Sequence, residues 1–378
     1  MAVSVVFGFG AVRRLSRLLD RLPSRRVLLV TGRTSFERSG AAAGIAPALR
    51  GREVQRFCEF SQNAKIEDVA CGLELFRSAA PDLILAVGGG TALDMAKLVN
   101  AIAHQDGDPV AIATGRSPIR HPGVPLVAVP TTAGSGSEAT HFAVVYVNRS
   151  KYSLTAASLL PRLAIVDPAL TFSLSPATTA VTGMDAFSQA VESYWSVHST
   201  AASKAWASRA IALALEHLPA AVHAPTPQAR RAMSKAAHLA GRAIDITRTT
   251  GAHAVSYALT SYFGIPHGHA VSLTLGQWLL YNSGVSDADV TDPRGAAYVR
   301  ETVGELVRMI GCTTAAEGCR RIEQLARTVG LETRLRALGV SAADIDKVIV
   351  PNVNVERVVN NPRALDAASL RHLVEAVS

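Results

Sequence analysis

An acid and an amide stand four residues apart in the stretch GMDAFSQAVESYW, residues 183–195. The stretch lacks proline and its apolar residues recur at helical spacing, so it predicts a helix. Residues four positions apart share one face of a helix, and we therefore expect Asp185 and Gln189 to point the same way. They are either two solvated polar residues or part of a site whose other members lie elsewhere in the chain.

Two histidines in a later stretch could complete such a site. His253 and His267 lie fourteen residues apart in GAHAVSYALTSYFGIPHGHA, residues 251–270. Imidazole nitrogens and carboxylate oxygens are ligands that Fe(II) and Zn(II) accept. Each histidine alone is more typical of a structural role, because eleven histidines in the chain offer many pairs. Together with Asp185 and Gln189 they form a candidate metal-binding set.

Two glycine-rich stretches follow predicted strands and could hold a phosphate group. The first, AVGGGTALDMAK at 86–97, leads into a predicted helix whose N-terminal amides could bind an anion. Thr91 is expected to be the N-cap of that helix, with Asp94 three positions on as in a capping box. The second, VPTTAGSGSEAT at 129–140, is rich in glycine and hydroxyl groups. An ordinary tight turn would explain the first stretch alone, but two such turns in one domain favour a nucleotide.

The secondary structure predicted for the chain, which must position these residues, changes in type near residue 171. Before it, short apolar or β-branched runs alternate with helical patterns, which predicts a layered α/β domain with a parallel sheet. An antiparallel hairpin is expected from 142–147 and 152–158. After it, the pattern is helical almost to the end. We expect a Rossmann-like α/β domain at 1–171 and an all-helical domain at 172–378.

The composition narrows the class of protein. Apolar residues make up 48% of the 378 residues and charged residues 18%, which is typical of a globular protein. No apolar run is long enough to span a bilayer and no secretory signal is recognised, so a cytoplasmic location is expected. The net charge of +8 comes from scattered arginines rather than a basic block. It therefore suits a small anionic substrate or phosphorylated cofactor at least as well as a nucleic acid.

Several of these motifs together resemble the iron-containing (group III) alcohol dehydrogenases. GGGTALDMAK, PTTAGSGSEAT, LAIVDP, GMDAFSQAVESY and the spaced histidines occur in the order found in that family, and the similarity extends nearly over the whole chain. The resemblance implies a dehydroquinate synthase-like fold with a dinucleotide-binding domain, a helical domain and the active site in the cleft between them. A homodimer is also expected.

Position by position, the resemblance implies roles for individual residues. Asp185, His253 and His267 correspond to three metal ligands, while Gln189 stands where the family usually has a fourth, histidine ligand. Tyr257 stands where many members have another histidine close to the nicotinamide, and it could relay a proton or form the wall of the pocket. Cofactor-binding residues are expected at Gly88, Gly89, Gly90, Thr91, Asp94, Thr131, Thr132, Ser135 and Lys151.

The amide at position 189 leaves three alternatives. Gln189 is a weak fourth ligand through its carbonyl oxygen, or water or substrate completes a three-ligand site, or the metal is lost. Fe(II) is favoured over Zn(II) by the resemblance. In the first two cases the metal would polarise a carbonyl group that accepts hydride from the nicotinamide.

The cofactor and the substrate are suggested by single residues. Gly32 and Arg33 occupy a region where members that prefer NAD often place an acid, which favours NADPH over NADH. The stretch 243–268 looks most like the phosphonoacetaldehyde reductase branch, which makes 2-hydroxyethylphosphonate in phosphonate natural-product (antibiotic) biosynthesis. Arg248 is then the candidate for the phosphonate. Alternatives are reduction of another short aldehyde such as lactaldehyde, reduction of maleylacetate, and a nucleotide-binding homologue without activity.

Overall fold

The apolar runs of the first part of the chain form a six-stranded, all-parallel sheet in the order β1-β8-β5-β4-β2-β3. Its strands are β1 (Ser4–Phe7), β2 (Arg26–Thr31), β3 (Glu53–Phe57), β4 (Leu83–Gly88), β5 (Leu126–Pro130) and β8 (Leu163–Val166). The computed structural model describes residues 3–378 of the chain. Strands β4, β5 and β8 are buried along their whole length, as expected of parallel strands that are covered on both faces.

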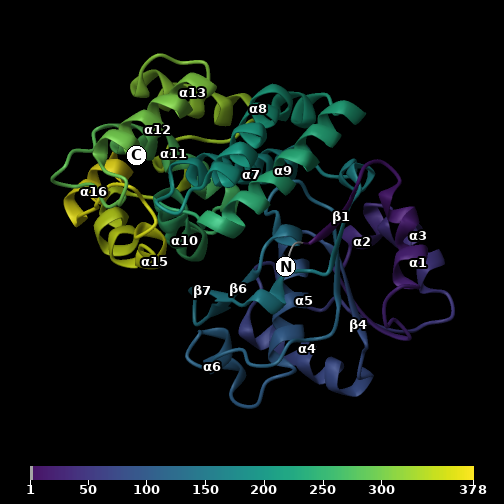
Figure 1. Ribbon diagram of the computed structural model, residues 1–378. Helices are drawn as coiled ribbons and strands as arrows, with labels where there is room; N and C mark the ends of the chain where they lie inside the picture. Colours follow the sequence, from purple (N-terminus) through teal and green to yellow (C-terminus); the bar gives the residue numbers. More distant parts are fainter. Residues whose placement is uncertain (1–2) are drawn as a thin grey trace. The chain divides into compact units, whose positions relative to one another are not determined.

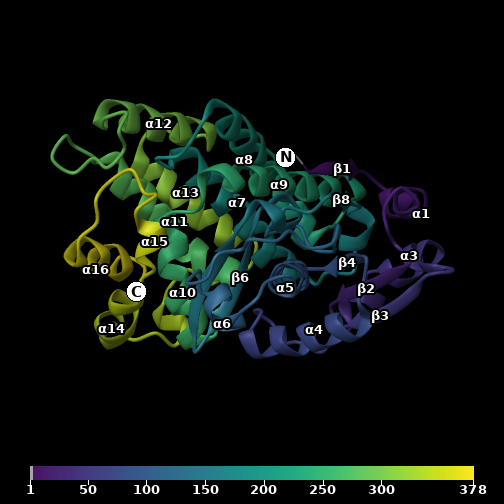
Figure 2. The same ribbon diagram turned by 60° about the horizontal axis from the view of Figure 1, so that its bottom comes forward.

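Helices cover the two faces of this sheet (Figures 1 and 2). Alternate residues of β4 face opposite ways: Ile84 packs in one apolar core with α4 (Ile66–Ala79) and α5 (Gly90–Ile102). Leu85 packs in a second core with α1 (Leu15–Leu19) and α3 (Ala41–Leu49). The short α-helices α2 (Ser35–Arg38) and α6 (Pro109–Ala113) also belong to this unit.

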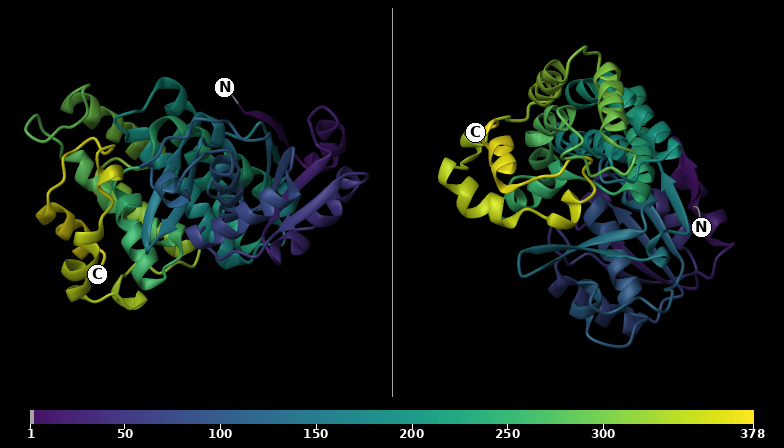
Figure 3. Two further views of the ribbon diagram at one scale, coloured as in Figure 1. Left: turned by 90° about the horizontal axis from the view of Figure 1, so that it is seen from below. Right: turned by 60° about the vertical axis from the view of Figure 1, so that its left-hand side comes forward.

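The predicted hairpin is present but its second strand is shifted. β6 (Phe142–Val147) pairs antiparallel with β7 (Ser150–Thr155), whereas the sequence predicts 152–158. Asn148 and Arg149 both have positive φ, 49° and 66°, as a two-residue hairpin turn requires. The strand therefore begins directly after this tight turn. Figure 3 shows the hairpin as a two-stranded arm of the first unit.

From Ser175 onward the regular elements are helices. Capping explains where the long helices begin: Ser175 caps α7, Thr200 caps α8 in a capping box, and Thr226 caps α9. The helices are α7 (Pro176–Trp195), α8 (Ala201–His223), α9 (Pro227–Thr247), α10 (Gly251–Phe263), α11 (His267–Ser283), α12 (Ala296–Met309), α13 (Ala315–Thr328), α14 (Ala342–Asp344), α15 (Val355–Val358) and α16 (Ala367–Glu375).

The chain divides into two units between Leu174 and Ser175. The fold class predicted from the sequence, an α/β domain with a parallel sheet followed by a helical domain, is confirmed. Among the described residues, every helix is too short or too polar to cross a lipid bilayer.

Candidate functional site

Three loops of the first unit meet where neighbouring strands end. Gly32 follows β2, Gly88 ends β4 with Gly89 and Gly90 directly after it, and the hydroxyl-rich stretch from Thr131 follows β5. In the sheet these strands are neighbours, and the order in which successive strands are added across the sheet reverses here: β3 lies beyond β2 on one side, and β5 lies beyond β4 on the other. The carboxyl ends of parallel strands at such a reversal are where α/β proteins bind nucleotides. The topology therefore gathers the predicted cofactor-binding turns at the carboxyl ends of three neighbouring strands.

Glycine is required where these loops touch. A Cβ atom on Gly89 would lie 3.2 Å from Thr132 Cγ2, and one on Gly90 would lie 2.8 Å from Ser135 Oγ. A Cβ atom on Gly88 would lie 2.7 Å from Ala92 Cβ and 3.4 Å from the backbone nitrogen of Gly32. The absence of side chains lets the loops approach closely and leaves their backbone exposed to a ligand.

The start of α5 differs from the prediction. The helix begins at Gly90 with Gly89 as its N-cap, so the predicted cap at Thr91 is wrong. Thr91 Oγ1 instead accepts a hydrogen bond from the backbone N–H of Asn63 at 3.4 Å. In the described part of the chain, no side chain caps the first turn of α5, which leaves its amide groups suited to an anion.

Asp94 and Lys97 fix the second glycine-rich stretch onto α5. Asp94 accepts hydrogen bonds from Ser137 Oγ at 2.6 Å and from the backbone N–H of Val144 at 3.1 Å, so it does not form the predicted capping box. Burial raises the pKa of Asp94, and the nearby Lys97 opposes this shift. The fully buried Lys97 donates to the carbonyl groups of Ser137 and Thr140 at 2.6 and 2.8 Å. Sequence reasoning missed Lys97 because its partners lie forty or more residues away.

Two of the predicted cofactor-binding residues, Lys151 and Arg33, are charged. Lys151 lies in β7 opposite Tyr146, and its charge also acts to lower the pKa of Asp94. Arg33 is exposed and forms an ion pair with the carboxylate of Glu59, which follows β3. A phosphate that binds Arg33 must therefore compete with Glu59.

In the second unit, α7, α10 and α11 bring three of the four predicted metal ligands together. Asp185 Oδ1 lies 3.5 Å from His253 Nε2 and 3.9 Å from His267 Nε2. The ligand atoms of all three residues lie within 4.8 Å of one another. Asp185 and His253 are buried, and His267 is partly exposed. A carboxylate and two imidazoles in this arrangement are a suitable donor set for Fe(II) or Zn(II).

Close helix packing makes this convergence possible. A Cβ atom on Gly268 would lie only 2.0 Å from the carbonyl oxygen of Val181 and 2.8 Å from Asp185 Cβ. The first turn of α11 therefore touches α7 only because position 268 is glycine. The preceding turn ends α10 with Gly264 in the left-handed region at φ 69°, and Pro266 precedes His267 at the start of α11.

Gln189 lies one turn after Asp185 on α7 and is also buried. Its Oε1 atom has no hydrogen-bond partner among the described residues. A buried carbonyl oxygen without a partner is costly, and a cation or a cation-bound water would satisfy it. This observation, with the donor set beside it, fits a divalent metal.

Glu192 supports His253 and was missed by the sequence reasoning. It is fully buried and accepts a hydrogen bond from His253 Nδ1. It also accepts from the backbone N–H groups of Thr250 and His253, both at 3.2 Å, and from Thr250 Oγ1 at 2.9 Å. Its spacing of seven residues from Asp185, which places both on one helix face, is the signal that could have identified it.

The carboxylates also set the charge of His253. Burial alone would lower its pKa, but Glu192 and Asp185 outweigh burial and raise the pKa to about 9. With Nδ1 engaged by Glu192, Nε2 is the nitrogen that faces Asp185. This is the arrangement in which a carboxylate orients a metal-binding imidazole.

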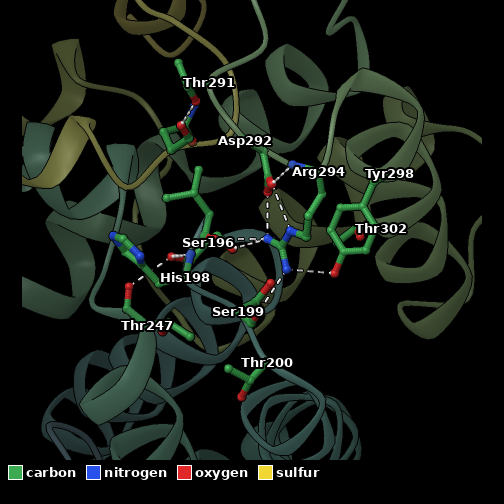
Figure 4. A network of polar contacts seen from close by, with 12 residues as sticks. Ser196, His198, Ser199, Thr200, Thr247, Thr291, Asp292, Arg294, Tyr298 and Thr302 are labelled. Carbon is green, nitrogen blue, oxygen red and sulfur yellow. Dashed lines mark hydrogen bonds and ion pairs between the residues drawn. The ribbon is translucent and has the colours of Figure 1, made fainter.

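A polar network holds the end of α7 (Figure 4). Arg294 pairs with Asp292 and donates to the carbonyl oxygens of Ser196 and Ser199 at 3.1 and 2.8 Å. Ser196 Oγ in turn donates to the carbonyl oxygen of Thr247 at 2.9 Å. The carbonyl groups of Ser196 and Ser199 are thereby satisfied, and the end of α9 is tied to the Ser196 hydroxyl group.

Arg248 and Tyr257 are the remaining predicted site residues of the second unit. Arg248 follows the last residue of α9 and has the unusual backbone angles φ 61° and ψ 178°. The buried Tyr257 has its ring centroid 6.1 Å from that of His267. Its hydroxyl accepts a hydrogen bond at 3.3 Å from Nε of Arg357, a residue that sequence reasoning did not identify.

Comparison with known proteins identifies similarity along nearly the whole chain. A family model described as iron-containing alcohol dehydrogenase matches residues 2–168, and one for the C-terminal part of the Fe-containing alcohol dehydrogenase family matches residues 179–378. The chain is 38% identical over 317 residues to a phosphonoacetaldehyde reductase of Streptomyces viridochromogenes, which covers 82% of this chain and 79% of the relative. It is 32% identical over 364 residues, 94% of this chain and 92% of the relative, to a 1,3-propanediol dehydrogenase of Klebsiella pneumoniae.

Solved structures agree with this similarity. The sulfoacetaldehyde reductase of Bifidobacterium kashiwanohense, solved in complex with NAD+, is 30% identical and has a TM-score of 0.88. The alignment covers 100% of this chain and 97% of the solved chain.

Proposed function

The chain belongs to the iron-containing alcohol dehydrogenase family, and on that premise we propose that it reduces phosphonoacetaldehyde to 2-hydroxyethylphosphonate with NADPH or NADH. Membership of this family makes it an NAD(P)-dependent oxidoreductase whose relatives act on aldehydes and alcohols. The observation that carries the proposal is the convergence of Asp185, His253 and His267.

The metal would be held by Asp185, His253 and His267, with Gln189 as a fourth, weaker ligand. A bound Fe(II) ion would supply Lewis-acid polarisation of the aldehyde oxygen. Glu192 keeps the Nε2 atom of His253 turned toward Asp185 through its contact with Nδ1. Tyr257 is assigned to the wall of the substrate site, because its ring lies beside His267 and its hydroxyl contacts Arg357.

The nicotinamide cofactor would be held by the first unit. Its pyrophosphate would lie against the glycines at 88–90 and Thr91, at the uncapped start of α5. Thr131, Thr132 and Ser135 would line it from the neighbouring turn, and Lys151 would contact the nicotinamide ribose. We propose NADPH as the preferred form because Arg33, rather than an acid, follows Gly32 after β2.

The substrate assignment rests on two relatives with similar chemistry. The phosphonoacetaldehyde reductase and the sulfoacetaldehyde reductase are both named for an acetaldehyde that carries an anionic group. Arg248 is proposed to bind this anion, since guanidinium geometry matches phosphonate oxygens. A homodimer in the cytoplasm that serves phosphonate biosynthesis is part of the same proposal.

The test follows nicotinamide absorbance with purified protein loaded with Fe(II), loaded with Zn(II) or treated with chelator. Phosphonoacetaldehyde, sulfoacetaldehyde, maleylacetate and propanal are compared with NADPH and NADH. We expect metal-dependent consumption with phosphonoacetaldehyde as the best substrate, and its loss in Asp185→Asn. Consumption with propanal but not the phosphonate would contradict the substrate. Cofactor binding without consumption under every condition would support a non-catalytic homologue instead.

A further inference from the structure

We propose that Arg357 and Arg248 together form one anion-binding subsite that holds the phosphonate end of the substrate between two guanidinium groups. This inference rests on the aldehyde reduction proposed above and deepens it. It adds a second, buried arginine from a separate helix and predicts selectivity for a dianion over a monoanion.

Arg357 is a buried cation whose guanidinium group contacts a neutral hydroxyl group. Arg357 is only 9% exposed, and its Nε atom donates a hydrogen bond to the Tyr257 hydroxyl at 3.3 Å. Among residues 3–378, no carboxylate lies within ion-pair distance of Arg357. A buried charge without a counter-ion is unfavourable, so an anionic ligand would stabilise it.

Arg248 adds a second positive charge beside it. Burial lowers the pKa of Arg248 and the charge of Arg357 lowers it further, while Asp245 opposes both effects. The segments that carry the two arginines are in contact, because Asn360, three residues after Arg357, donates through Nδ2 to the carbonyl oxygen of Thr249, the residue after Arg248, at 2.9 Å. A single carboxylate offsets only one of the two positive charges. A phosphonate carries two negative charges and three acceptor oxygens, which two guanidinium groups can share.

The backbone of Arg248 is held in an unusual conformation at an energetic cost. The angles φ 61° and ψ 178° lie in a region that glycine normally occupies. Thr247 Oγ1 bonds to the Arg248 carbonyl oxygen at 2.9 Å, and the Arg248 N–H donates to the Ile244 carbonyl oxygen at 2.9 Å. Such strain is held in place by its surroundings and is typical of ligand-binding positions.

Tyr257 links the arginines to the proposed metal ligands. It lies four residues after His253 on α10, so both face the same side of the helix. Its ring is close to His267 and its hydroxyl contacts Arg357. The short helix α15 is held on α10 by a hydrogen bond from the Asn354 N–H to the Ala254 carbonyl oxygen at 3.3 Å. One tyrosine side chain thus separates the imidazole from the guanidinium, which suits a short aldehyde with an anion at its far end.

The experiment compares Arg357→Met, Arg357→Lys and Arg248→Met with wild type, and uses Arg209→Met, an exposed arginine on α8, as the matched control. Calorimetry measures methylphosphonate and methanesulfonate binding, and kinetics measure kcat and KM for phosphonoacetaldehyde, sulfoacetaldehyde and propanal. For Arg357→Met we expect phosphonate binding and kcat/KM to fall about 10- to 100-fold, mainly through KM, as for a charge-assisted contact. The loss should be smaller for the sulfonate and smallest for propanal, and Arg357→Lys should be intermediate.

The outcomes separate this inference from the proposed function. Equal losses for all three aldehydes in Arg357→Lys and Arg357→Met, with unchanged methylphosphonate binding, would overturn the subsite. Phosphonoacetaldehyde turnover that is insensitive to Arg357 would overturn it while leaving the reductase intact. Methylphosphonate binding that depends on both arginines, in a protein that reduces no aldehyde, would support the subsite and contradict the reductase. If Arg357→Met fails to fold, Arg357→Lys and Arg248→Met decide.

Discussion

The carboxylate of Glu192 accepts a hydrogen bond from Nδ1 of His253, so the other ring nitrogen of this histidine faces Asp185. Both partners are buried, and the same carboxylate also accepts from the first turn of α10. The orientation of the imidazole is therefore set by α7 before any ligand binds.

Replacing Glu192 with glutamine should weaken metal binding about 10- to 100-fold, the usual effect of losing a carboxylate that supports a metal-binding histidine. Chelator competition with Zn(II) measures the affinity. Glu216→Gln, at an exposed acid on α8, is the control and should have no effect. Unchanged affinity in Glu192→Gln would show that the contact is only structural.

Metal uptake by the metal-free protein should be strongly dependent on pH. The pKa of His253 is raised to about 9, so below that pH the imidazole is protonated and a cation must displace the proton from Nε2. Apparent affinity should therefore rise with pH, by about tenfold per unit for one proton, and level off above pH 9. Proton release on adding Zn(II) between pH 6 and 9 measures this. An affinity that is flat over this range would contradict the raised pKa.

Gln189→His should strengthen metal retention at least severalfold, because imidazole is a better ligand than an amide oxygen for these ions. Metal content after dialysis against chelator measures the gain, and Gln189→Leu provides the comparison. A loss of metal in the leucine variant would identify Gln189 as a ligand. Equal retention by glutamine and leucine would instead indicate a three-ligand site.

Glu59→Gln should shift cofactor preference toward NADPH. The substitution frees Arg33 to bind a 2′-phosphate, and the expected rise in the NADPH to NADH ratio of kcat/KM is about two- to fivefold, since an exposed ion pair contributes about 0–1 kcal/mol. Glu74→Gln, at an exposed acid on α4, is the control. A preference that does not change would mean that Arg33 lies outside the cofactor site.

Gly268→Ala should reduce both stability and metal affinity. The new methyl group would lie 2.0 Å from the Val181 carbonyl oxygen, so α11 must move away from α7 at a cost of about 1–3 kcal/mol. Thermal unfolding and chelator competition measure the two effects. Gly304→Ala on α12 is the matched control because its nearest contact, at 3.5 Å, is an ordinary one, and it should be neutral or stabilising.

The local pattern of apolar and polar residues was enough to predict much of the architecture. Alternating buried strands and helices predict the parallel sheet, because both of its faces must be covered, and helical periodicity predicts the second unit. Asp185 and Gln189 could be placed on one face from their spacing alone. Membership of the family could be inferred because several motifs occur in a characteristic order.

Only the tertiary structure decided which distant residues become partners. Glu192 binds a histidine 61 positions away, Arg357 contacts a tyrosine 100 positions away, and Lys97 anchors a loop at least 40 positions away. Such contacts leave no local periodicity, since they depend on how helices pack and where a missing Cβ atom allows close approach, as at Gly268. The sequence by itself determined the elements and the candidate ligands; the packing of helices decided which side chains orient those ligands and which charges remain for a substrate.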